Sequence, residues 1–384
     1  MHRRIAETLE SGDAELMQSR PDTLAQHWSA AGEPLRAASA WLAAARKAAA
    51  GGADALAQCE RGLRLLDGVG QGAERDRIEF GLLLCIVRLS HKRSLGDYPH
   101  FLAHLARLLA LAGRGDGDPA ELFDALWASW ESAGSLDGHR HALHLAEQLH
   151  ALAALQPGSA LQLCARYALG ASSFWCGAFT AARDHLRHVL DRLQAEALQV
   201  LNPFGLDLES GAHAYLGLTS WRLQQPRDAM HHARLAVALA RARNNDFARC
   251  MAGTFAATIE RWRDAPLRAR TLARSALRVA QRSHAPTFAA VLHSLEAWAD
   301  VREHADPTRL PALEDGVQRV RTSYPAALPM QYAMLADALR RLGHADRAAA
   351  TLAEGSAFAD HLDDRHEPLY DRAADPSQQG QQAA

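Results

Sequence analysis

The sequence predicts an all-α fold in which pairs of helices stack into a solenoid. Ala and Leu, both strong helix formers, dominate the 384 residues and aromatic residues make up only 6%, so almost no strand is expected. A pattern of a small residue, a tight turn and a second small residue recurs about every 40 residues, a period typical of stacked helix pairs. Prolines fall near the predicted helix starts, where the missing N–H is tolerated.

The repeat is clearest in the second half of the chain. Its five copies are Gly170…Gly177…Ala182, Gly217…Gln224…Ala229, Ala257…Asp264…Ala269, Ala297…His304…Pro311 and Ala336…Gly343…Ala348. The first positions of successive copies lie 47, 40, 40 and 39 residues apart, and the fourth copy is the least regular. Small residues at these positions let two helices approach closely. Solenoids of this kind present surfaces for binding.

Residues 1–72 predict an N-terminal helical segment, which begins with a charged amphipathic helix over residues 2–10. Pro21 and Asp22 open the next helix, with Asp22 as the candidate N-cap before an apolar run that includes Trp28. Further helices are expected over residues 35–50 and 53–66, with breaks at 32–34, 51–52 and 68–72.

Residues 73–158 predict divergent helical repeats, and residues 159–370 predict the regular ones. In the divergent part we expect helices over 74–89 and 121–132, turns at 95–98 and 137–138, and a loop over 113–118. In the regular part, one helix ends at Trp175, the next begins at Phe179, and a break over 202–207 lengthens that repeat. Residues 371–384 contain mainly Ala, Asp, Ser, Gln and Gly, which predicts a disordered tail.

Each copy of the repeat resembles a tetratricopeptide-type helix pair. In such a pair the first helix carries a large apolar residue beside a small one, a glycine forms the turn, and the second helix carries small residues. Leu169-Gly170, Gly177 and Ala182 match this arrangement closely, and the last copy matches it again. The resemblance implies a right-handed superhelix of about eight helix pairs.

A wider resemblance lies in the order of several short motifs along the chain. They are Arg4-Ile5-Ala6, Leu24-Ala25-Gln26-His27-Trp28, Ala31-Gly32, Ala40-Trp41, Glu60-Arg61-Gly62-Leu63, Phe204-Gly205-Leu206-Asp207 and Ala214-Tyr215-Leu216-Gly217. Their order is similar to the C-terminal repeat region of bacterial STAND-type signalling ATPases, including those fused to adenylate cyclase domains and relatives of the maltose-regulon activator. The resemblance implies a sensor or scaffold region.

The ATPase module of that family has no counterpart in the chain. No GxxxxGK[ST] motif is present, and neither of the only two lysines, Lys47 and Lys92, follows a glycine loop. The resemblance therefore starts at Met1 and covers the repeat region without the ATPase module. A stand-alone protein, the product of a split gene and a truncated chain all stay open.

Charge and composition argue against several classes of protein. A formal net charge of −2, from 42 basic and 44 acidic residues, is unlike a dedicated nucleic-acid binder. The longest apolar run, residues 81–87, is too short to span a bilayer. Five scattered cysteines without a CxxC motif indicate reduced thiols. We therefore expect a cytoplasmic protein that contacts neither a membrane nor, directly, nucleic acid.

Candidate catalytic and metal-binding groups are weak. Two histidine pairs have helical spacing, His100 with His104 and His141 with His144, but no third ligand lies nearby. Cys176 precedes His185 and His188, yet nothing in the sequence places them in contact or supplies an oxyanion site. We therefore predict no metal, no cofactor and no enzymatic activity, with a metal-dependent enzyme kept as an alternative.

The candidate binding residues are tryptophans and arginines in the first helices of the pairs, at positions that line the concave groove of tetratricopeptide repeats. They are Trp175, Trp221, Arg222, Arg261, Trp262, Trp298 and Arg340, with Arg341 beside the last. Trp and Arg are enriched at binding hot spots. The alternative is that these tryptophans pack between repeats as core residues. An arginine-rich stretch, residues 261–282, would either attract an acidic partner or form a solvated helix face.

These features together predict a non-catalytic helical-repeat scaffold or sensor of a bacterial signalling or transcriptional regulatory system. Its groove would bind a protein, a peptide or a small effector, and the sequence does not indicate an oligomeric state. An alternative is a regulatory fragment that acts in trans with an ATPase or a cyclase.

Overall fold

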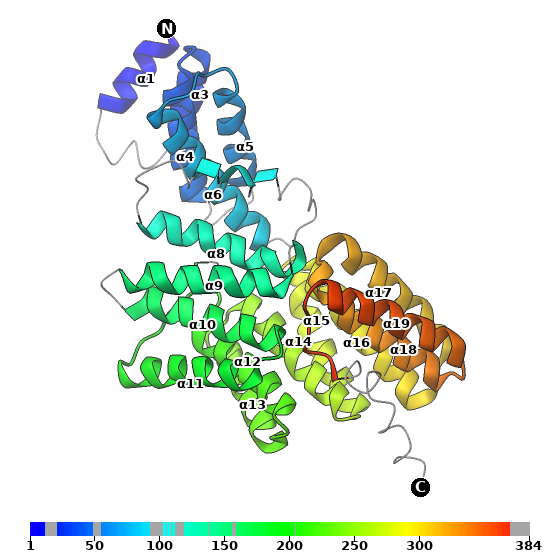
Figure 1. Cartoon of the computed structure of the whole chain (residues 1–384). Coiled ribbons are helices and arrows are strands. Elements are labelled where there is room, and N and C mark those ends of the chain that lie inside the picture. The colour runs from blue at the N-terminus through cyan, green and yellow to red at the C-terminus, as the bar shows by residue number, and fades with distance from the viewer. Residues whose placement is uncertain are drawn as a thin grey trace. The chain divides into compact units, whose positions relative to one another are not determined.

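A computed structural model describes residues 1–11, 21–48, 55–92, 103–104, 106–108, 110–111, 119–136, 138–155, 159–203 and 205–368 (Figure 1). Over these residues the chain is helical, and the sole extended pairing there is an isolated bridge between Leu201 and Asp207. The predicted all-α solenoid is confirmed. The turn expected at 95–98, the loop at 113–118 and the tail at 371–384 lie outside the described residues.

The chain divides into two compact units, with the division between Ala128 and Ser129 inside α8 (Pro119–Leu136). The segment boundaries after residues 72 and 158 stay predictions. The described helices of the N-terminal unit before α8 are α1 (His2–Ser11), α3 (Pro21–Ala30), α4 (Pro34–Ala48), α5 (Ala55–Leu66) and α6 (Ala73–Lys92). Trp28 of α3 and Trp41 of α4 are the large side chains of its first core cluster. Three alanines of α4, Ala37, Ala40 and Ala44, belong to the same cluster, and their small side chains let α3 pack closely against α4.

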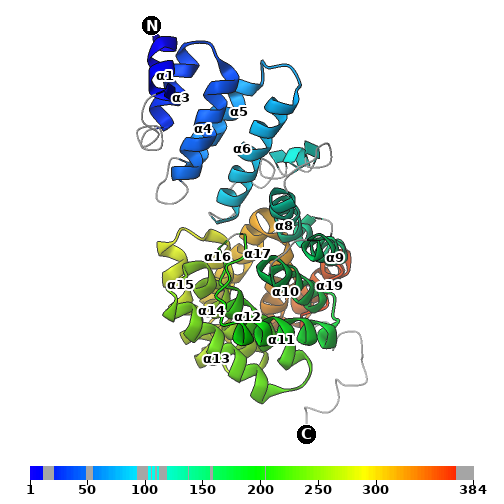
Figure 2. The ribbon, with the colours of Figure 1, turned by 90° about the vertical axis from the view of Figure 1, so that its left-hand side faces the viewer.

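The C-terminal unit continues with helices that stack in chain order (Figures 1 and 2). After α9 (His139–Ala154) they form five consecutive pairs. The pairs are α10 (Ser159–Trp175) with α11 (Phe179–Ala195), α12 (Leu208–Arg222) with α13 (Pro226–Ala242), α14 (Asp246–Trp262) with α15 (Pro266–Arg282), α16 (Pro286–His304) with α17 (Leu310–Ser323), and α18 (Leu328–Arg341) with α19 (Ala345–His361). Short 3-10 turns, η1 (Pro307–Arg309) and η2 (Pro325–Ala327), precede α17 and α18.

The turn within each pair is made by a residue with positive φ, which ends the first helix. Four of the five predicted turn residues adopt it: Gly177 (80°), Gln224 (58°), Asp264 (54°) and Gly343 (83°). In the fourth copy Ala305 (51°) replaces His304, because α16 has 19 residues where α14 has 17. The predicted repeat register is therefore right in four copies and one residue early in the fourth.

The first helices of the five pairs, α10, α12, α14, α16 and α18, are called the inner row below. Each packs against the next member of this row, whereas the second helices of successive pairs contact one another less among the described residues. A stack that is tighter on one side curves toward that side. The burial pattern agrees: α12 is buried at Leu208 and from Ser210 to Ser220, whereas α13 buries only one residue in every three or four.

Close approach between paired helices depends on glycine at Gly170. A Cβ there would lie 2.7 Å from Leu186 Cγ and 3.4 Å from the Ala182 carbonyl oxygen. We expect Gly170→Val to lower the free energy of unfolding by about 1–3 kcal/mol, because the added methyls force α10 and α11 apart. Ala181→Val, which adds a similar bulk on the exposed face of α11, is the control and should cost less than about 0.7 kcal/mol. Equal losses in the two variants, measured by urea unfolding, would contradict this account.

Candidate functional site

After α19 the chain turns back, and it contacts the first turn of α9 and the last residues of α10 and α14. This segment, residues 362–367, is called the strap below (Figure 1). Asp363 takes a positive φ of 53° and ends α19. Leu362, Asp364, His366 and Glu367 are each at most 3% exposed, whereas Arg365 is exposed. A run of polar side chains is thus buried, which is unusual unless each group finds a partner.

Two main-chain hydrogen bonds attach the strap to helix ends. The His139 N–H, in the first turn of α9, donates to the Leu362 carbonyl oxygen at 2.7 Å. The Arg365 N–H donates to the Trp175 carbonyl oxygen at 2.8 Å, at the end of α10. Gly177 leaves room for this approach, since a Cβ there would lie 2.8 Å from Arg365 Cβ.

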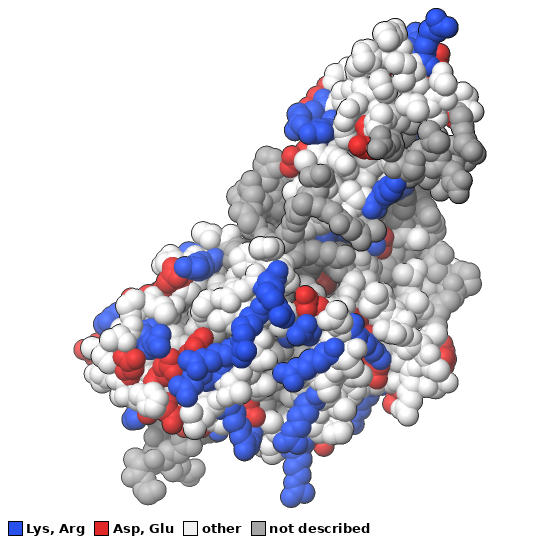
Figure 3. Space-filling view, turned by 180° about the vertical axis from the view of Figure 1, so that it is seen from behind, with Lys and Arg blue, Asp and Glu red and all other residues white. Residues whose placement is uncertain are grey.

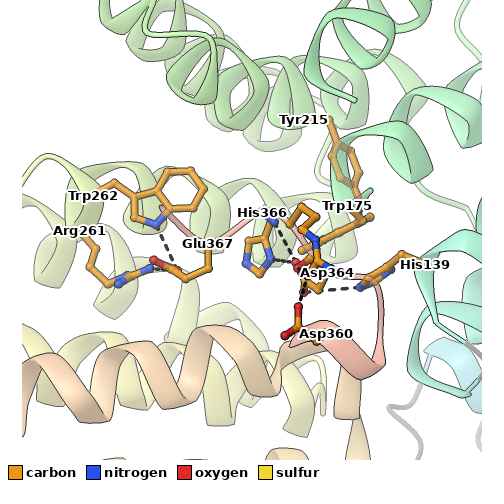
Figure 4. A network of polar contacts seen from close by, with 10 residues as sticks. His139, Trp175, Tyr215, Arg261, Trp262, Asp360, Asp364, His366 and Glu367 are labelled. Atoms are coloured by element: carbon orange, nitrogen blue, oxygen red, sulfur yellow. Dashed lines mark hydrogen bonds and ion pairs between the residues drawn. The ribbon is translucent and has the colours of Figure 1, made fainter. Parts of the chain in front are cut away.

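The Asp364 carboxylate is held between two imidazoles (Figure 4). One of its oxygens lies 2.5 Å from His366 Nδ1 and the other 3.6 Å from His139 Nε2. The His366 N–H also donates to Asp364 at 2.9 Å, which fixes a tight local turn. Burial pushes the pKa of the Asp364 carboxyl upward, but His366 and His139 overcome this effect and hold the pKa well below its usual range. Asp364 is therefore an ionised carboxylate at neutral pH.

Trp175 forms the aromatic platform of the site. Its ring stacks on His139 at a centroid distance of 5.2 Å and meets His366 edge-on at 4.6 Å. Its Nε1–H donates to the Tyr215 hydroxyl at 3.1 Å, which fixes the indole from α12. One imidazole of the platform comes from α9 and the other from the strap.

Glu367 is the second buried carboxylate of the strap, and it lies against the last residues of α14. Its carboxylate forms an ion pair with the Arg261 guanidinium and accepts a hydrogen bond from Trp262 Nε1 at 3.2 Å (Figure 4). The two charged side chains are 1% and 5% exposed. A charge pair so thoroughly removed from water is held by its partners, and removing one partner leaves an expensive buried charge.

The structure brings three of the predicted groove residues together at the strap: Trp175, Arg261 and Trp262. The others lie elsewhere. Trp221 is half-buried, Arg222 packs its guanidinium over the Phe179 ring at 4.7 Å, and Arg340 is exposed, as is Arg341.

Trp298 is 1% exposed within the hydrophobic core of α14–α19, and its Nε1–H donates to Asp337 at 2.7 Å. This ring packs between repeats, the alternative that the sequence left open.

Sequence reasoning missed the strap and His139. Asp363, Asp364, Arg365, His366 and Glu367 follow one another without helical periodicity, and such a polar run has the pattern of a solvated chain end. The one available signal was the density of ionisable groups just after the last repeat.

A separate hollow of about 750 Å³ lies beside α11, α12 and α13. His213 and His232 face each other on its wall, with their Nδ1 atoms 2.9 Å apart. Burial, followed by neighbouring imidazoles, lowers the pKa of each to about 4. Both rings are therefore neutral at pH 7, and one donates to the other.

This pair predicts a loss of stability in mild acid. The unfolded imidazoles bind protons near pH 6.5 and the folded ones near pH 4, so the unfolded state holds more protons between these values. The free energy of unfolding should therefore fall as pH drops through this window, as measured by urea unfolding. His150, His185 and His188, whose pKa values are also lowered, act in the same direction. His232→Gln should make the dependence shallower, and an unchanged slope would contradict the assignment.

Other predicted sites gain no support from the described residues. No group of three or more His, Cys, Asp or Glu in the described part could hold a metal ion. Burial raises the pKa of the Cys176 thiol to about 11, so it is protonated near neutral pH and a weak nucleophile. None of the described helices combines the length and apolarity needed to cross a bilayer. His100 lies outside the described residues.

The arginine-rich stretch is partly neutralised. The α15 helix carries five arginines and no acidic residue, but Arg270 pairs with Asp300 at 2.8 Å and Arg274 with Glu296 at 2.6 Å. Figure 3 shows acidic side chains interspersed among the basic ones on the face of the C-terminal unit seen there.

Comparison with known proteins shows the fold. No protein-family model matches the chain, and no curated protein matches its sequence significantly. A Rap protein complexed with competence and sporulation factor matches with a TM-score of 0.55 at 10% identity, covering 93% of this chain and 95% of that one. Aspartyl phosphate phosphatase F from Bacillus subtilis also gives 0.55, at 13% identity, covering 93% and 87%.

A third neighbour comes from the predicted family. A signal transduction ATPase with numerous domains from Pyrococcus horikoshii, which has a tetratricopeptide repeat sensor, gives a TM-score of 0.40 at 11% identity. The match covers 92% of this chain and 55% of that one. The tetratricopeptide-like helical repeat is confirmed by the Rap likenesses.

Proposed function

We propose that the C-terminal unit is a non-catalytic regulatory module whose inner row binds a non-helical segment of a protein or peptide partner. One observation carries the proposal: α10 and α14 of the inner row, together with α9, already bind a non-helical segment, the strap, through both its main chain and its side chains. The donors at the helix ends, a Trp platform and a buried guanidinium are the groups that recurrent peptide sites use.

The likeness to a Rap protein solved with competence and sporulation factor supports a binding role for a fold of this kind. The order of the N-terminal motifs supports an origin in bacterial STAND-type signalling proteins, and hence a cytoplasmic sensor or scaffold.

A peptide-display selection on the immobilised full-length chain tests the proposal. We expect enriched peptides whose binding is lost in Trp175→Ala and Trp262→Ala but kept in Arg340→Ala, an exposed residue in the last turn of α18. Circular dichroism of each variant shows whether helicity is kept. Peptides that bind Trp262→Ala as well as the original chain would place the binding surface elsewhere and refute the proposal.

A further inference from the structure

We infer that the strap is an internal mimic of the partner, and that the inner row takes an acidic peptide segment whose carboxylates replace those of Asp364 and Glu367. This inference rests on the proposed function and specifies the chemistry of the partner. It follows from which groups belong to the receptor and which to the strap.

The receptor consists of groups that belong to the helices and not to the strap. His139 stands in the first turn of α9, Trp175 ends α10, and Arg261 with Trp262 ends α14. Each presents a donor or an aromatic face, and Arg261 carries the positive charge. The neighbouring acidic residue Glu260 does not cancel that charge, because Arg263 binds it at 2.8 Å.

The strap supplies the complementary groups in a fixed order. A carboxylate at Asp364 meets His139, an imidazole at His366 covers Trp175, and a second carboxylate at Glu367 meets Arg261. Between them Arg365 points to solvent and contributes its main-chain N–H. A partner with two carboxylates three residues apart, and a planar side chain just before the second, would meet the same receptor groups.

Because the strap is joined to α19, it competes at the high effective concentration of a tethered ligand. A partner binds only when it displaces the strap. Its apparent affinity is therefore the intrinsic affinity multiplied by the fraction of molecules in which the strap is undocked. Weakening the strap without touching the receptor should therefore tighten binding of a peptide supplied from outside.

The test uses a fluorescent peptide that copies residues 361–368, with blocked termini, and the full-length chain. By fluorescence polarisation we expect Glu367→Gln to bind this peptide at least about tenfold more tightly than the original chain, since the strap loses its charge and the receptor stays intact. A peptide with amides in place of the carboxylates should bind at least about tenfold more weakly to the same variant.

Receptor variants complete the test. Arg261→Gln should abolish binding of the acidic peptide. If its circular dichroism shows lost helicity, Trp262→Phe, which removes only the Nε1–H donor and a little volume, should weaken binding severalfold. Equal affinity of the original chain and Glu367→Gln, or of the acidic and the amide peptides, would overturn the inference.

The outcome also separates the inference from the proposed function. Apolar or basic peptides that bind through Trp262 while the acidic peptide does not would refute the acidic partner and leave the peptide-binding function standing. Failure of every peptide class to bind Glu367→Gln would refute both.

Discussion

Replacing Arg261 with leucine is expected to release the strap and to lower the free energy of unfolding by up to about 3–5 kcal/mol. The reason is the burial of Glu367, whose side chain is 1% exposed and whose charge Arg261 neutralises. Without the guanidinium, the carboxylate either stays buried at a large electrostatic cost or moves into water and takes the strap with it. The second route limits the loss to the energy with which the strap is docked.

Hydrogen exchange distinguishes these two routes. If the strap leaves, the Arg365 amide loses the protection that its hydrogen bond to the Trp175 carbonyl provides, and so does the His139 amide. Chemical unfolding followed by circular dichroism gives the energy. An Arg365 amide that stays protected in an equally stable Arg261→Leu variant would contradict the importance of this ion pair.

Two further variants control for trivial effects of losing an arginine. Arg192→Leu removes one partner of an exposed pair with Glu196 on α11, and pairs of that kind contribute less than about 1 kcal/mol. The double variant Arg261→Leu with Glu367→Leu removes both buried charges together. It should recover most of the lost stability, because replacing a whole buried pair with apolar groups is close to neutral or stabilising.

The fold could be predicted because its determinants are local. A glycine such as Gly170 indicates close helix approach, because it has no side chain to keep the helices apart. The turn residues Gly177, Asp264 and Gly343 indicate where a helix ends to within a few positions. Each signal recurs with the repeat, so one copy supports the next. The single slip, at Ala305, occurred where α16 is longer than its neighbours and η1 follows, which interrupts the period.

The site could be predicted only in part because it joins distant parts of the chain. Trp262 and Arg261 are inner-row residues by their position in the repeat, and that half of the site followed from the register. Glu367 lies more than 100 residues further along and belongs to no repeat. Helical periodicity carries no information about where a segment after the last helix will dock, and the polar sequence of the strap matches that of a solvated end.

Trp298→Ala is expected to be among the most damaging single substitutions in the C-terminal unit, with a loss of about 3–5 kcal/mol in the free energy of unfolding. The indole is 1% exposed and belongs to the core that helices α14 to α19 form together, so alanine would leave a cavity. The change also removes the hydrogen bond from the indole to Asp337. Such a bond contributes about 1.5–3 kcal/mol when one partner is charged, and part of this energy is already included in the expected loss.

Trp298→Phe separates packing from hydrogen bonding, since it keeps most of the volume and loses the Nε1–H donor. It should cost less than half as much as alanine. The strap site lies on α9, α10 and α14, so well below its melting temperature Trp298→Ala should bind a peptide selected for the inner row as the original chain does. A variant with unchanged stability and lost binding would instead make Trp298 part of the binding surface, the role that its position in the repeat first suggested.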